Sequence, residues 1–130
     1  MQQLFKEALK IRESLNGNEY LSPLAQTHQD FANYYSSIQN TNESNKHFKF
    51  AIQLFQKASV FDSIALFWKA QALIDYGAFL FNTFKYKRAS EAMEIFNQAK
   101  RILENYDVEK EPFLSAYSVL LQNIYVVNNT

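Results

Sequence analysis

Four side chains in this sequence could take part in acid-base chemistry or bind a metal ion: His28, Asp30, His47 and Asp75. A zinc site on the only two histidines would need further ligands, such as carboxylates, from elsewhere in the chain. Cysteine is absent, which excludes disulfides and thiolate ligands. Because no nucleophile motif, glycine-rich phosphate loop or metal-binding motif accompanies these residues, we expect no catalytic, metal or cofactor site. Both histidines are expected to be structural or surface residues.

The two aspartates belong to an internal repeat. Residues 25–32 (AQTHQDFA) return 45 positions later as residues 70–77 (AQALIDYG), and a further step of 45 places Tyr125 in line with Tyr35. Self-similarity at a fixed period of this size is typical of stacked supersecondary units. The repeat therefore points to a binding surface made of repeated elements and not to an enzyme.

Composition is consistent with one domain of ordinary charge. The chain has 130 residues, of which 48% are hydrophobic, and its 13 basic residues balance 13 acidic ones. The chain therefore has no excess of positive charge that would attract nucleic acid or an anionic membrane. The first residues include Lys6 and Glu7, unlike a signal peptide, and no apolar run approaches the ~18 residues of a membrane span. We expect a cytoplasmic protein.

The elements that position these residues are predicted to be helices. Glycine and proline occur twice each, and apolar residues recur at intervals of three and four. Ser22-Pro23 is expected to begin the second helix and Asn16-Gly17-Asn18 to end the first. The six expected helices, joined by short antiparallel connections, cover residues 2–15, 23–39, 44–59, 64–82, 86–105 and 112–127.

Residues 27–51 resemble a tetratricopeptide repeat. The matching positions are Phe31-Ala32 and Tyr35 on the first helix, and Ser44, Phe48 and Ala51 on the second. Residues 8–13 are similar to the end of a repeat of the longer, kinesin-light-chain-like variety. His28 stands where the family often has tryptophan, and the spacing exceeds the usual ~34 residues.

The second repeat can be aligned in two ways. Tyr76-Gly77 matches the first helix, and the second helix is then marked either by Tyr86 and Ala89 or, with three inserted residues, by Ala92, Phe96 and Ala99. The resemblance implies an all-α solenoid of antiparallel hairpins. Its parts are a half repeat 1–22, repeats 23–63 and 64–111, and a half repeat 112–130. The side chains expected at the interfaces are Phe31, Tyr35, Phe48, Phe55, Tyr76 and Phe96.

The resemblance also implies a non-catalytic module that binds a protein or peptide on its concave face. The first helices would supply Gln26, Gln29, Asp30, Asn33 and Ser37, then Gln71, Ile74, Asp75, Ala78 and Asn82, and finally Ala116, Val119, Asn123 and Val126. Two readings of Asp30 and Asp75 stay open. They bind Lys, Arg or backbone N–H groups of a partner, or they have no such role, because each caps or pairs locally or because both are relics of duplication.

The ends of the chain suggest a second function. The last helix keeps an apolar face with no further helix to cover it, formed by Leu114, Tyr117, Leu121, Ile124 and Tyr125, and the first helix exposes Leu4, Ala8 and Ile11. The chain is then a piece of a longer array, the sensor part of a larger peptide-responsive regulator, or a unit that pairs with its own copies. Lys85-Tyr86-Lys87-Arg88 is expected to be a solvated turn and not a single-strand binding site.

Overall fold

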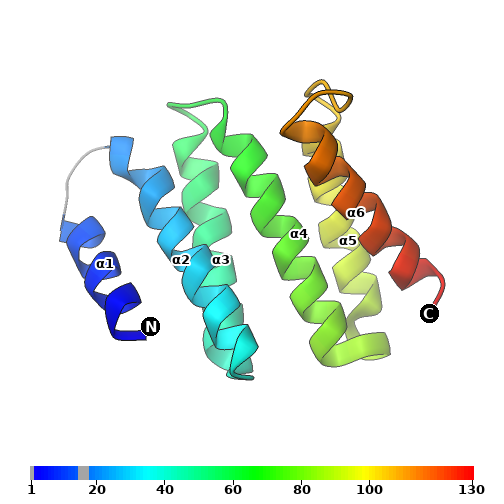
Figure 1. The fold of residues 1–130 in the computed structure, drawn as a ribbon, viewed down its shortest axis with the longest axis horizontal. Helices are drawn as coiled ribbons and strands as arrows, with labels where there is room; N and C mark the ends of the chain where they lie inside the picture. Colours follow the sequence, from blue (N-terminus) through cyan, green and yellow to red (C-terminus); the bar gives the residue numbers. More distant parts are fainter. Residues whose placement is uncertain (1, 15–17) are drawn as a thin grey trace. The chain divides into compact units, whose positions relative to one another are not determined.

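The computed structural model describes residues 2–14 and 18–130, with the side chains of residues 2, 9, 11–14 and 18 left out (Figure 1). Asn16 and Gly17 of the expected turn and the side chain of Ile11 thus lie outside the described part, and Asn18 begins η1. All regular structure in that part is helical, so the all-α prediction is confirmed. The elements are α1 (Gln2–Ser14), η1 (Asn18–Tyr20), α2 (Leu21–Ser37), α3 (Thr41–Ala58), α4 (Ala65–Phe84), η2 (Lys85–Arg88), α5 (Ala89–Leu103) and α6 (Phe113–Asn128).

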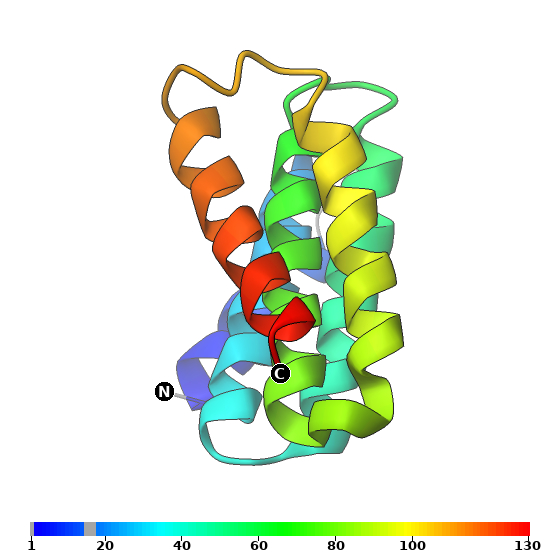
Figure 2. The same ribbon diagram turned by 90° about the vertical axis from the view of Figure 1, so that its right-hand side faces the viewer.

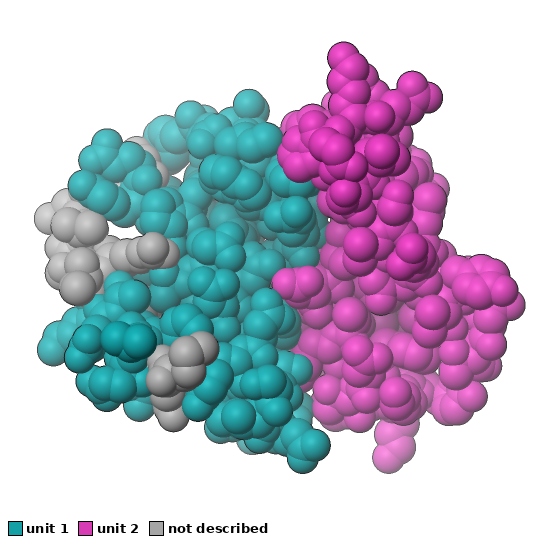
Figure 3. Space-filling model, viewed as in Figure 1, with its two compact units in different colours: residues 1–72 teal, residues 73–130 magenta. Residues whose placement is uncertain are grey.

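The chain divides into two compact units, residues 1–72 and residues 73–130, which are coloured separately in Figure 3. The first unit contains α1, η1, α2, α3 and the beginning of α4. The second contains the rest of α4, η2, α5 and α6.

The first unit is centred on the antiparallel hairpin of α2 and α3 (Figure 1). The hydroxyl of Ser44 donates a hydrogen bond to the backbone oxygen of Ala32 at 2.8 Å, and both residues are fully buried. Two small residues at this crossing let the helices approach closely. Phe31, Phe48 and Phe55 fill the space beside it and are almost completely excluded from solvent, as the sequence predicted.

Two further elements pack against this hairpin. The ring of Phe5 on α1 lies 5.4 Å from that of Phe31 on α2. At the start of α4, the Trp68 ring lies 6.3 Å from Phe55, and Lys69 Nζ donates to Gln56 Oε1 at 2.6 Å. Because residues near the end of α3 meet residues near the start of α4, these two helices also run antiparallel.

The second unit is organised by a close contact between α4 and α5. A Cβ atom at Gly77 would lie 2.6 Å from the ring of Phe96, so the ring packs directly against the glycine backbone. Ala92, Phe96 and Ala99 are all fully buried, whereas Tyr86 is 72% exposed. Of the two residue sets considered for the second helix, the buried one is thus Ala92, Phe96 and Ala99, whereas Tyr86 faces solvent. The axis of α6 is tilted relative to the axis of α5 (Figure 2).

The expected start of α2 was wrong. The helix begins at Leu21 after Tyr20, which forms no side-chain cap, so Ser22 is not the N-cap and Pro23 is the third helical residue. Proline is tolerated there because N–H groups in the first turn have no partner within the helix.

α3 begins three residues earlier than expected, since the Asn40 side chain caps it by accepting a hydrogen bond from the Glu43 N–H at 3.3 Å.

Candidate functional site

The polar residues expected to bind a partner on α2 fall into two groups. Gln26, Asp30, Asn33 and Ser37 are exposed and follow one another at helical spacing along one face. Gln29, by contrast, is buried. Its neighbours four residues before and three residues after are Ala25 and Ala32, both fully buried, so Gln29 lies at the edge of the packed face and offers a partner little surface.

Asp30 makes a contact on its own helix. Gln26 Nε2 donates to Asp30 Oδ1 at 3.2 Å, one turn away. This is the local pairing that the sequence left open. One amide donor does not saturate a carboxylate, which can accept about four hydrogen bonds, so Asp30 retains the capacity to bind a partner.

The matching residues on α4 and α6 are also mixed in exposure. Gln71 and Asn82 are exposed, Asp75 and Ala78 are half-buried, and Ile74 is buried next to the buried Ala70, four residues before it. On α6, Val119 and Val126 are exposed, Ala116 is buried, and the Asn123 amide donates to the backbone oxygen of Val119 at 3.0 Å. Asp30 belongs to the first unit and Asp75 to the second, so a shared concave wall stays a prediction.

The structure brings together two residues that sequence reasoning treated as unrelated. His28 on α2 and His47 on α3 lie with their Nδ1 atoms 2.9 Å apart, joined by a buried hydrogen bond. The hairpin explains the meeting, because positions on its two arms pair about the turn near residue 38. Ala32 faces Ser44, and one step further from the turn His28 faces His47. The register of α2 against α3, which the structure supplies, is what places the two histidines opposite each other.

Aromatic rings surround the histidine pair. His47 stacks on Phe31 and Tyr35, with ring centroids 4.9 and 5.6 Å away, and His28 lies 5.3 Å from the ring of Phe50. Burial lowers the pKa of His28 from 6.5 to about 4, with smaller contributions from His47 and Lys46. Burial also lowers the pKa of His47, although Glu43, whose Oε2 lies 3.5 Å from His47 Nε2, opposes that shift. Both imidazoles are therefore neutral at pH 7.

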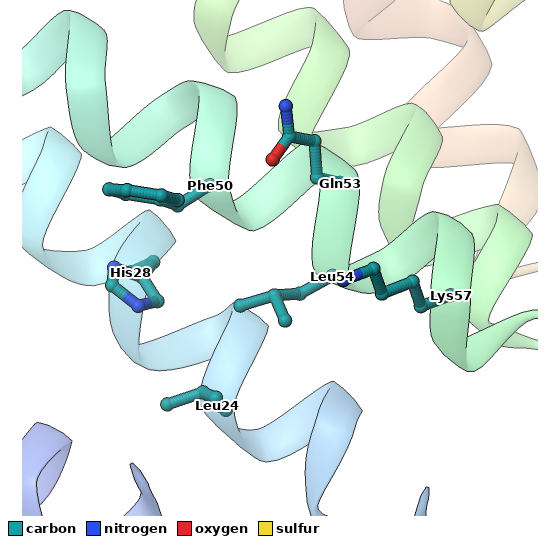
Figure 4. A pocket seen from close by; sticks show the side chains of 6 residues that line it. All are labelled: Leu24, His28, Phe50, Gln53, Leu54 and Lys57. Carbon is teal, nitrogen blue, oxygen red and sulfur yellow. The ribbon is translucent and has the colours of Figure 1, made fainter.

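A cavity of about 360 Å³ opens beside this pair in the first unit. Figure 4 shows the residues that line it, which come from α2 and α3. The apolar walls are Leu24, Leu54 and the partly exposed Phe50, and His28 lies between them. Gln53 and Lys57 are exposed polar residues at its border. The cavity thus combines apolar walls, a neutral imidazole and a cation.

The residues expected to support self-association lie on α6. Leu114 is 42% exposed, Leu121 41% and Tyr125 67%, whereas Tyr117 and Ile124 are half-buried. Leu120, on the other side of the helix, is fully buried. Of the expected α1 residues, Leu4 is exposed and Ala8 half-buried.

The basic cluster at residues 85–88 forms the turn η2. Arg88 binds Glu91 through two hydrogen bonds of 2.7 and 2.8 Å and lies over the ring of Phe84. Lys85 lies over the ring of Phe81. These contacts give two of the three basic side chains a role within the turn.

Within residues 2–14 and 18–130, no three His, Asp or Glu side chains are grouped so that they could hold a metal ion. None of the helices in this part has the length and apolar character needed to cross a bilayer. Comparison with the models of known protein families, with curated proteins and with solved structures found no match.

Proposed function

We propose that this chain is a non-catalytic protein-interaction module of tetratricopeptide type, which binds an extended, basic segment of a partner along the polar face of its first helices. The observation that carries the proposal is the separation of buried apolar residues and exposed polar residues on two faces of α2. The residues of the family pattern, Phe31 and Ala32, are buried in the hairpin, whereas Gln26, Asp30 and Asn33 are exposed along one face.

Packing gives no reason for this polar row to be repeated. Gln26, Asp30 and Gln71 are exposed, and an exposed position on a helix tolerates almost any polar residue. Gln26 and Asp30 nevertheless return as Gln71 and the half-buried Asp75 in the second copy. Amide and carboxylate groups at these positions suit a partner that supplies N–H donors and cationic side chains. Lysine and arginine are the natural complement of the two carboxylates.

A competition experiment tests this proposal. Fluorescence anisotropy compares a labelled lysine- and arginine-rich peptide with a glutamate-rich peptide of the same length. We expect only the basic peptide to bind, and added salt to weaken it because the contacts are largely solvated. Asp30→Asn combined with Asp75→Asn should reduce affinity by up to about fivefold per site, since exposed ion pairs contribute about 1 kcal/mol or less.

The matched control is Glu94→Gln, which removes an exposed carboxylate from α5 outside the polar row. This variant should bind the basic peptide as the parent does. A double variant that binds as tightly as the parent, or equal binding of the acidic peptide, would contradict the proposal.

A second candidate function rests on α6. Leu114, Leu121 and Tyr125 are spaced by seven and four residues and form an exposed apolar stripe, which favours pairing between copies of the chain. Sedimentation at tens of micromolar should then show association that Leu121→Glu or Tyr125→Glu weakens, because each places a charge in the contact. Gln122→Glu adds the same charge beside the stripe and should have little effect. A parent protein that stays monomeric would remove this candidate.

A further inference from the structure

The carboxylate beside the histidine pair favours one arrangement of its protons. Glu43 Oε2 lies 3.5 Å from His47 Nε2, and because a carboxylate only accepts hydrogen bonds, this contact favours the His47 tautomer with its proton on Nε2. In neutral His47 the other nitrogen, Nδ1, then presents a lone pair. It accepts from Nδ1–H of His28 across the 2.9 Å contact, which leaves Nε2 of His28 unprotonated.

His28 Nε2 has no hydrogen-bond donor among the described residues. The His28 side chain is a cavity-lining residue that is only 7% exposed. Among the described residues, every fully buried side-chain nitrogen or oxygen has a hydrogen-bond partner. Because His28 Nε2 has no such partner, it keeps some contact with solvent, and the cavity that the His28 side chain lines is the place where a ligand could reach its lone pair. A buried acceptor without a donor is costly unless a ligand or water supplies one.

The other side chains of the cavity define what else a ligand must carry. Leu24, Leu54 and Phe50 provide apolar and aromatic walls for a flat ring. Lys57 extends toward Leu54 (Figure 4) and forms no ion pair with any residue in the described ranges, so its ammonium is available to an anion. The volume of about 360 Å³ is near the lower end of the ~300–1,000 Å³ typical of small-molecule sites.

We propose that this cavity binds a small aromatic carboxylate that also carries a hydroxyl or N–H donor. The donor binds His28 Nε2, the ring lies against Phe50 and the two leucines, and the carboxylate binds the ammonium of Lys57. This site uses the opposite side of α2 from the polar row, and it stands independently of the peptide-binding proposal.

A series of three matched probes tests the assignment by NMR titration of the full chain. 4-Hydroxyphenylacetate has the ring, the donor and the anion; phenylacetate lacks the donor; tyramine replaces the anion by a cation. We expect 4-hydroxyphenylacetate to bind and to shift the signals of His28, Phe50 and Leu54. Phenylacetate should bind about fivefold more weakly, as expected for the loss of one hydrogen bond. Tyramine should bind most weakly because its charge repels Lys57.

Lys57→Gln should weaken 4-hydroxyphenylacetate by about fivefold while leaving the fold intact, because Lys57 is exposed. Lys49→Gln, which removes another exposed lysine of α3 that does not line the cavity, should have no effect. Equal binding of all three probes, no binding of 4-hydroxyphenylacetate, or equal effects of the two lysine variants would overturn the proposal.

The proton positions can be tested without any ligand. Long-range nitrogen–proton spectra distinguish the two tautomers of a neutral imidazole. We expect the Nδ1–H form for His28 and the Nε2–H form for His47. The Nε2–H form of His28 would overturn the proposal, since that nitrogen could not then accept a hydrogen bond from a ligand.

Discussion

Acidification from about pH 7.5 to about pH 5 is expected to destabilise the fold through His28. The pKa of this side chain falls from 6.5 to about 4 in the folded protein, chiefly because burial disfavours the charged ring. As the pH drops below 6.5, the unfolded chain therefore binds a proton before the folded chain does. The stabilisation is complete above pH 6.5 and is lost progressively as the pH approaches 4.

The magnitude follows from the two pKa values of His28. Each pH unit between them changes the free energy of unfolding by about 1.4 kcal/mol, so the loss is about 2 kcal/mol at pH 5 and about 3 kcal/mol near pH 4. The charged groups around His28 are Lys46, Glu43 and Lys57, together with the titratable His47. The pKa of His47 is also lowered, so this residue adds to the loss in the same direction.

Urea unfolding at about pH 7.5 and about pH 5 measures this loss. The transition can be followed by the fluorescence of Trp68, which is the one tryptophan in the sequence. The matched variant is His28→Phe combined with His47→Phe, which keeps two rings and removes both titrating groups. Glu43 loses its contact with His47 in this variant, but its side chain is 39% exposed and can be hydrated. The comparison of the two proteins isolates the contribution of the two histidines. The parent should lose at least about 2 kcal/mol more than the variant, since His47 adds to the loss from His28. Parallel losses would refute this reasoning, as would an NMR titration in which His28 of the parent has an ordinary pKa.

Three further substitutions probe the packing that supports the sites. Phe48→Ala should cost about 3–5 kcal/mol in urea unfolding, because it deletes a fully buried aromatic ring, and unchanged stability would contradict the hairpin core. Gly77→Ala should lower the thermal midpoint, because overpacking against Phe96 costs about 1–3 kcal/mol and outweighs a helix-propensity gain of about 1 kcal/mol; a raised midpoint would exclude the close contact. Asn40→Ala should cost about 1 kcal/mol through loss of the α3 cap, and equal stability would show that the cap contributes nothing.

Much of the fold could be predicted because helical periodicity and large buried residues are local signals. The spacing of Phe31, Phe48, Phe55 and Phe96 placed these rings in the core, where the structure has them. The start of α2 was mispredicted because a proline signals the first turn of a helix and not one exact position within it.

The candidate sites were harder to predict because they depend on contacts between helices. Gln29 and Ile74 were assigned to a binding face from family positions alone, but each lies beside buried small residues and is itself buried. The pairing of His28 with His47 and the cavity next to it depend on the register of α2 against α3, which the sequence patterns of the single helices do not contain.

The most direct test of the interaction-module function is an NMR titration of the labelled protein with the lysine- and arginine-rich peptide. The function proposed for the polar row predicts shifts at Gln26, Asp30 and Asn33 on α2, and at Gln71 and Asp75 on α4. These shifts should be absent with the glutamate-rich peptide and reduced in the Asp30→Asn, Asp75→Asn double variant. Shifts confined to other surfaces, or none at peptide concentrations that saturate anisotropy, would contradict the assignment of the polar face as the binding surface.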